Sequence, residues 1–229
     1  MPLIVRAFPL RRDRSEAEAF AGELRRRADD ARRFYTSFGV RRESWFFQGE
    51  PFGPLVIGVT DADDRIESNA ARYAATDEAF ASWFKERVQT LSGVDQTKEP
   101  LGPPAALVFE SSRAELPRGI AISARIYPVK NREDLLRFAD ELRLRAAKTR
   151  AFYESFNVPR EVWYLQETER GPVVIGVTAM EAPEKAKDYA ETDEPFAVWF
   201  KQRVIDVTGI DPNVTPLGPP SELIYEFQT

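Results

Sequence analysis

The sequence contains no cysteine and no histidine among its 229 residues. Without thiols the chain can form neither disulfides nor zinc–thiolate sites, and it has no cysteine nucleophile. Without imidazoles it lacks the most common metal ligand and the usual general base near neutral pH. Haem held by a proximal histidine and serine–histidine triads are therefore excluded. No dense acidic cluster resembles a calcium-binding loop, so we expect no metal and no cofactor.

Long apolar runs and a strong charge of one sign are also lacking. No window approaches 18 uninterrupted apolar residues, which predicts that no segment spans a membrane. The net charge is −5 with acids and bases interspersed, and this argues against nucleic acid as a partner. The opening "MPLIVRAF" is typical of a strand rather than a signal peptide, so we expect a cytoplasmic protein.

What the sequence does contain is a long internal repeat. The segment "TDEAFASWFKERV" from Thr76 returns as "TDEPFAVWFKQRV" from Thr192. "GPLVIGVT" and "PLGPP" also have second copies, "GPVVIGVT" and "PLGPP". The spacing of the copies is 119 residues at Arg6, 118 at Trp45 and 116 at Thr76. Such a period is far longer than that of solenoid repeats and indicates a tandem duplication of a small domain.

The duplication predicts two domains, residues 1–111 and 119–229, joined by a polar linker at 112–118. Within the first domain, the pattern predicts strand 3–8, a long helix 15–38, a hairpin from "ESWFFQG" and "PLVIGVT", a helical region 66–91 and a final strand. This βαββαβ order is that of a ferredoxin-like unit. In the repeated helix, Trp83 and Trp199 are the predicted buried anchors.

Side chains alternate across a strand, so each predicted sheet has two faces. We expect the apolar face with Leu3, Val5 and Ala7 to lie under the helices. The other face would carry Arg6, Phe8, Phe46, Gln48, Gly58, Thr60 and Glu110 in the first unit, and Arg125, Tyr127, Tyr164, Gln166, Gly176, Thr178 and Glu226 in the second. A face so rich in aromatics needs a partner, which predicts that the two sheets pack face to face.

On its element order, duplicated strand pattern and "PLGPP"-to-strand ending, the whole chain resembles the dimeric α+β barrel superfamily. That superfamily includes the antibiotic-biosynthesis monooxygenase, EthD-like and muconolactone-isomerase-like families. The resemblance implies an α+β fold in which two tandem ferredoxin-like βαββαβ units form a pseudo-dimeric barrel within one chain. A swapped or further homodimer stays open. The resemblance also implies a small, often aromatic, substrate, but it transfers no catalytic residue.

Several polar residues of the mixed faces are candidates for chemistry. We predict Arg125, Glu226 and Tyr164 as catalytic residues, because an arginine can hold an enolate, a glutamate in a dry pocket can act as a base and a tyrosine can donate to an oxyanion. The predicted substrate-binding residues are Tyr127, Gln166, Thr178, Arg6, Gln48 and Glu110. The alternative is structural, namely Arg–Glu ion pairs between the first and last strands of each unit.

Two classes of function follow. The first is a small-molecule-binding protein that acts as a cofactor-free enzyme of oxygenase, isomerase or cyclase type. The second is a non-catalytic ligand-binding or protein-interaction module with a solid interior. A cavity of a few hundred Å³ between the two sheets, lined by Arg125, Tyr164, Gln166 and Glu226, would favour the first class.

Overall fold

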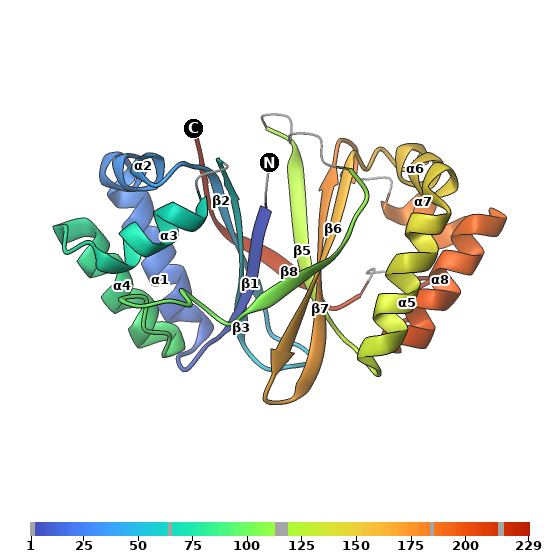
Figure 1. The fold of residues 1–229 in the computed structure, drawn as a ribbon, viewed down its shortest axis with the longest axis horizontal. Helices are drawn as coiled ribbons and strands as arrows, with labels where there is room; N and C mark the ends of the chain where they lie inside the picture. The colour runs from blue at the N-terminus through green and yellow to red at the C-terminus, as the bar shows by residue number, and fades with distance from the viewer. Residues whose placement is uncertain (1–2, 64–65, 113–118, 184–185, 215–217) are drawn as a thin grey trace. The chain divides into compact units, whose positions relative to one another are not determined.

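A computed structural model describes residues 3–63, 66–112, 119–183, 186–214 and 218–229. The chain divides into two compact units (Figure 1). Unit 1 comprises Met1–Pro104 and Ser221–Thr229, and unit 2 comprises Ala105–Pro220. Each unit contains a four-stranded antiparallel sheet and helices, so the α+β class and the predicted order of elements are confirmed.

The elements follow each other in the same order in both halves of the sequence. The first half contains β1 (Leu3–Pro9), α1 (Arg14–Arg26), α2 (Ala28–Ser37), β2 (Val40–Gln48), β3 (Leu55–Ala62), α3 (Ile66–Ala75), α4 (Ala79–Ser92) and β4 (Ala105–Glu110). The second half contains β5 (Ala121–Pro128), α5 (Arg132–Leu144), α6 (Ala146–Ser155), β6 (Arg160–Thr168), β7 (Gly171–Met180), α7 (Ala186–Glu191), α8 (Pro195–Thr208) and β8 (Ser221–Gln228). The long helix predicted at 15–38 is two helices, because the backbone leaves helical geometry at Arg27.

The final strand of each repeat belongs to the sheet of the other repeat. The strand orders are β1-β3-β2-β8 and β4-β6-β7-β5. The prediction that the first and last strands of a repeat are neighbours is therefore wrong, since β8 pairs with β2 and β4 pairs with β6. For the same reason the compact units do not coincide with the predicted domains 1–111 and 119–229. The side-chain pattern of a strand does not specify which free sheet edge it joins.

The helices cover one face of each sheet, and that face differs from the predicted one. Arg6 and Phe8 face Phe20 of α1 and Phe84 of α4 across a cavity. Leu3, Val5 and Ala7 point to the opposite face and are also buried. Both sheet faces are thus largely withdrawn from solvent, so apolarity alone could not choose the face that lies under the helices.

The register of the hairpin corrects the prediction for β2 and β6 as well. Trp45 pairs with Gly58, and Trp163 pairs with Gly176. Directly paired residues share a face of the sheet. The tryptophans therefore share the pocket face with the two glycines, whereas Gln48, Tyr164 and Gln166 point to the opposite face.

The aromatic core of each unit lies between the sheet and the helices. In unit 1 it joins Phe20, Phe34 and Phe84 to Trp45 and to Tyr225 of the exchanged strand. Unit 2 repeats this arrangement around Phe138, Phe152, Phe200 and Trp163. The dense ring contacts fix the helices above the sheet and thereby the walls of the cavity described below.

The predicted anchors Trp83 and Trp199 are only partly buried. The Arg27 guanidinium lies 4.4 Å from the ring centroid of Trp83, and that of Arg145 lies 4.1 Å from Trp199. The fully packed aromatics of these helices are their neighbours, such as Phe84 and Phe200. An arginine stacked on the indole thus takes the place of complete burial.

None of the helices in the described part of the chain is long and apolar enough to cross a membrane.

Candidate functional site

Each unit has a cavity between its sheet and its helices. We call the cavity of unit 1 the Glu43 pocket and that of unit 2 the Glu161 pocket, after the carboxylate that each contains. Their volumes are about 220 Å³ and about 460 Å³. Both are lined mainly by aromatic and aliphatic side chains, so the few polar groups that reach them are exceptional. A cavity was predicted between the two sheets, lined by Arg125, Tyr164, Gln166 and Glu226. The observed cavities lie instead between each sheet and its helices, and Arg125 alone of those four residues lines one of them.

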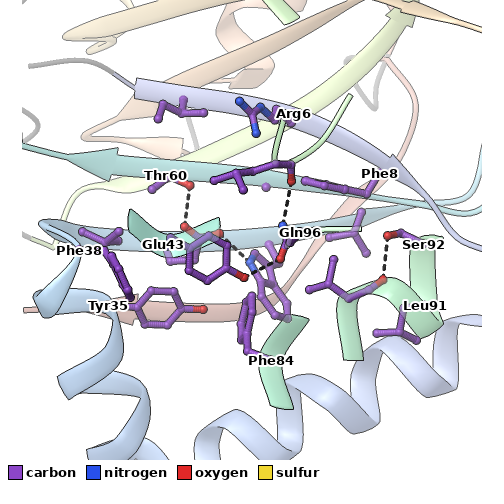
Figure 2. A pocket seen from close by; sticks show the side chains of 18 of the residues that line it. Arg6, Phe8, Tyr35, Phe38, Glu43, Thr60, Phe84, Leu91, Ser92 and Gln96 are labelled. Atoms are coloured by element: carbon purple, nitrogen blue, oxygen red, sulfur yellow. Dashed lines mark hydrogen bonds between the residues drawn. The ribbon is translucent and has the colours of Figure 1, made fainter. Parts of the chain in front are cut away.

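Glu43 and Glu161 occupy equivalent places on β2 and β6. Thr60 Oγ1 donates to Glu43 Oε2 at 2.7 Å, and Trp45 Nε1 donates to Glu43 Oε1 at 2.8 Å (Figure 2). In unit 2, Trp163 Nε1 donates to Glu161 Oε1 at 2.9 Å. Thr178 is the second partner of Glu161. Each carboxylate is therefore fixed in orientation by a tryptophan two residues along the strand and a threonine on the neighbouring strand.

Burial changes the acidity of both carboxyl groups. Desolvation raises the pKa of Glu43 and of Glu161 to about 7, although the hydrogen bonds from threonine and tryptophan act in the opposite direction. The Glu161 side chain is only 9% exposed. Glu43 lies equally deep in the protein, and the cavity gives its side chain some accessible surface. A carboxyl group that titrates near neutrality can take up or release a proton at physiological pH.

A positive charge accompanies the carboxylate of the Glu161 pocket. Arg125 on β5 lines this cavity together with Tyr127 two residues later. Its charge lowers the pKa of Glu161 against the larger effect of burial. Burial raises the pKa of Tyr127, and the nearby charge of Arg125 reduces this increase. An arginine and a tyrosine hydroxyl beside a base are groups that can stabilise a negative charge formed on a bound molecule.

Tyr153 on α6 is another residue that lines this cavity, and its hydroxyl oxygen is buried in the protein. Its side chain is 7% exposed, and its hydroxyl has no hydrogen-bond partner among the described residues. Burial raises its pKa well above the ordinary value, so the group is a neutral donor. A buried polar group without a partner is costly and is often found where a ligand or water binds.

Glycines keep the sheet open beside both carboxylates. A Cβ atom at Gly176 would lie 3.6 Å from Glu161 Oε1 and 3.7 Å from the Tyr127 ring. At Gly58 it would lie 3.8 Å from Glu43 Oε1. These are ordinary contact distances, so the glycines are not needed to avoid a clash. Their effect is to leave space for a bound molecule directly against the carboxylate.

The predicted site residues divide into two groups. Arg6 lines the Glu43 pocket, and Arg125, Tyr127 and Thr178 line the Glu161 pocket. The others point away from these cavities: Gln48, Glu110, Tyr164, Gln166 and Glu226.

Glu110 and Glu226 are partners in ion pairs, but not with the predicted arginines. Arg160 Nε donates to Glu110 Oε1 at 3.1 Å, and Arg42 Nε donates to Glu226 Oε1 at 3.0 Å. These pairs connect β4 to β6 and β8 to β2, as the exchanged strand order requires. Pairs of Arg6 with Glu110 and of Arg125 with Glu226 between neighbouring strands are thus ruled out.

Sequence reasoning missed Glu43 and Glu161 altogether. The signal was present as a glutamate two residues before each hairpin tryptophan, in "ESW" and "EVW". A period of two places both side chains on one face of a strand. An acid at an interior strand position, present in both copies of the repeat, pointed to a buried carboxylate.

Among the described residues, no group of three or more acidic side chains is arranged to hold a metal ion.

Three solved structures are similar to the chain over nearly its whole length. An anthrone oxidase-like protein is 11% identical with a TM-score of 0.49, over 99% of this chain and 96% of that chain. A "putative monooxygenase" from Lactobacillus acidophilus NCFM is 10% identical with a TM-score of 0.44, over 98% and 92%. Another of that name, from Fusobacterium nucleatum, is 13% identical with a TM-score of 0.46, over 99% and 94%.

All three similarities are at 10–13% sequence identity and at TM-scores below 0.5. At such identities and TM-scores they carry no argument about the chemistry of this chain. No protein-family model matches the sequence, and no curated protein matches it. The assignment of a function therefore depends on the geometry of the two pockets.

Proposed function

We propose that the Glu161 pocket binds a fused-ring aromatic ketone or phenol and that Glu161 removes a proton from it. The observation that carries this proposal is a deeply buried carboxylate, with a pKa raised to about 7 by desolvation, in an aromatic cavity of about 460 Å³. This volume lies in the range of small-molecule sites. The aromatic walls favour flat rings, and Arg125 provides the charge that an anion needs.

The proposed step starts with a carbon acid next to a carbonyl group. The Glu161 carboxylate takes the proton, and the electron pair of the broken C–H bond moves to the carbonyl oxygen, which gives an enolate. Arg125 and the Tyr127 hydroxyl stabilise that oxygen. Positioned proton transfer of this kind contributes roughly 10²–10⁴-fold to a rate.

Three reaction types share this step and need no organic cofactor. Return of the proton to a different carbon is an isomerisation. Attack of the enolate carbon on a second carbonyl group of the same molecule is a cyclisation. Reaction of the enolate with dioxygen, which then accepts its electrons, is an oxygenation. The protein is accordingly proposed as a cofactor-free enzyme of isomerase, cyclase or oxygenase type.

The shared step can be measured without knowing the substrate. With the bicyclic ketone 2-tetralone in D₂O, we expect the protein to accelerate exchange of the α-hydrogens for deuterium. The loss of the NMR signal of these hydrogens measures the rate of exchange. Glu161→Gln should reduce the acceleration at least 100-fold, because an amide cannot accept the proton. The rate should rise with pH and level off above about pH 7, where Glu161 is ionised.

Glu43→Gln is the matched control, since it makes the same change in the other unit. We expect it to leave the exchange rate within a factor of two. Arg125→Met should lower the rate at least tenfold while 2-tetralone, which is neutral, still binds. Binding that persists in the wild type without any accelerated exchange would refute catalysis and leave a ligand-binding module.

A further inference from the structure

Two hydrogen bonds, which we call the clasp, bridge residues that line the Glu43 pocket. The Tyr73 hydroxyl of α3 donates to Gln96 Oε1 at 2.7 Å, and Gln96 Nε2 donates to the Leu101 carbonyl at 2.9 Å (Figure 2). Gln96 is only 9% exposed, so both hydrogen bonds are largely shielded from water. The clasp connects the helix on one side of the cavity to the "PLGPP" loop on the other, and all three residues line the pocket.

Among the described residues that line the Glu161 pocket, no equivalent of this clasp is found. Pro212 occupies the position of Gln96 in the repeat, and a proline side chain cannot hydrogen-bond to Tyr189, the counterpart of Tyr73. Two further exchanges make this cavity more polar: Ser123 stands for Ile4, and Tyr127 stands for Phe8. The repeats thus keep the glutamate, threonine and tryptophan but differ in the hydrogen bonds and the polarity of the side chains around the cavity.

The volumes set an upper limit on what each pocket holds. A cavity of roughly 150 Å³ lined by apolar side chains accommodates one benzene ring. By this measure the Glu43 pocket, at about 220 Å³, has room for a single substituted ring. The Glu161 pocket, at about 460 Å³, has room for two or three fused rings.

The charges differ as well. Arg125 acts on the Glu161 carboxylate, whereas the carboxylate that acts on Arg6 is Glu99. The groups that stabilise the ionised form of Glu43 are the neutral side chains of Thr60 and Trp45. Arg6 also lines this pocket, but Glu99 already opposes its charge, so Arg6 is less available to balance a second negative charge near Glu43 and the pocket disfavours anions. A neutral ring with one polar substituent suits it, since that substituent can hydrogen-bond to the carboxyl group.

We propose that the Glu43 pocket is a second ligand site, selective for neutral single-ring phenols, while the Glu161 pocket takes larger or anionic aromatic molecules. The volume of the pocket and the hydrogen bonds of the clasp determine the first selectivity, and the carboxylate of Glu99 that acts on Arg6 determines the second. This inference rests on the proposed function for the Glu161 pocket, but it makes a separate claim about the other unit.

The test measures the binding stoichiometry of three probes to the full chain by calorimetry. p-Cresol, a neutral single-ring phenol, should bind two molecules per chain. The bicyclic phenol 2-naphthol should bind one, and the single-ring anion 4-methylbenzoate should bind one. Gly58→Val and Gly176→Val are matched variants that fill one pocket each with a side chain suited to a strand. Gly58→Ala and Gly176→Ala are milder versions with room for the added carbon, should the valine variants fail to fold.

Gly58→Val should remove one p-cresol and leave 2-naphthol and 4-methylbenzoate unchanged. Gly176→Val should remove the other p-cresol and both larger or charged probes. Gln96→Ala, which opens the clasp, should allow a second 2-naphthol to bind, with an affinity at least tenfold above that of the wild-type Glu43 pocket.

The outcomes separate this inference from the proposed function. Two equal 2-naphthol sites in the wild type, or p-cresol binding that Gly58→Val does not change, would overturn the second-site proposal alone. Single-site p-cresol binding removed by Gly58→Val, with no 2-naphthol bound at all, would overturn the role of the Glu161 pocket and leave the second site standing.

Discussion

Glu161 combines a cost in stability with a capacity for chemistry. Burial raises its pKa in the folded protein to about 7, from an ordinary value of 4.5. The folded state consequently binds this proton more tightly than the unfolded chain does. The stability that this gives is fully present below about pH 4.5 and is lost as the pH rises to about 7. Retention of the charged form at neutral pH is what makes the group available as a base.

Glu161→Gln should therefore stabilise the protein at high pH only. The amide resembles the protonated acid, so it removes the cost of burying a charge. At pH 8.5 we expect the free energy of unfolding to increase by on the order of 2–3 kcal/mol, and at pH 4 to remain unchanged. Chemical denaturation at the two pH values measures this difference. The same gain is expected for Glu43→Gln, and a gain that is equal at both pH values would show that the carboxyl group is not the cause.

At the scale of elements, the exchanged strands are held by ion pairs of unequal burial. The Arg160 and Arg42 side chains are 3% and 6% exposed. Their carboxylate partners differ more, with Glu110 at 14% and Glu226 at 34%. Removal of one member of a buried pair is costly because the other charge stays in the protein interior, and access to water reduces that cost.

Glu110→Gln should accordingly destabilise the protein more than Glu226→Gln. We expect losses of about 3 kcal/mol for the first and about 1–2 kcal/mol for the second, since Glu226 is already partly hydrated. Thermal and urea unfolding of the two variants provide the comparison. Equal losses, or a larger loss for Glu226→Gln, would contradict the assignment of burial. Neither change should alter hydrogen exchange of 2-tetralone, because both carboxylates point away from the pockets.

At the scale of the whole molecule, the last strand of each repeat completes the sheet of the other repeat. β8 contributes Ile224, Tyr225 and Phe227 to the core of unit 1, although it follows unit 2 in the sequence. β4 likewise belongs to unit 2. The two repeats are therefore not independent segments of chain, and each depends on the other for its fourth strand.

Removal of residues 221–229 should damage the distant unit 1 more than the adjacent unit 2. Without β8, the edge of β2 is unpaired and part of the aromatic core is uncovered. We expect the amides of β2 to lose most of their protection against hydrogen exchange, measured by mass spectrometry, while those of β6 keep theirs because β4 remains. Loss of protection in β6 with β2 unchanged would mean that β8 belongs to the repeat that precedes it.

The sequence by itself determined the duplication, the order of strands and helices and the α+β class. Periodicity and repeated segments carry these features, and both are local properties of the chain. The absence of histidine and cysteine likewise restricted the chemistry to carboxylates, arginine and hydroxyl groups before any coordinates were known. Arg125, Tyr127 and Thr178 were identified as site residues because they are polar groups on otherwise apolar strands.

Only the tertiary structure decided which face of each sheet lies under the helices and which edge the last strand joins. Both faces are apolar enough to be buried, so the pattern of β1 could not separate Arg6 from Val5 as the residue facing the cavity. The edge choice depends on pairing between residues that are far apart in the sequence, such as Trp45 with Tyr225, 180 positions later. The proposed role of Glu161 depends on both, because burial by the surrounding structure is the largest effect on its pKa.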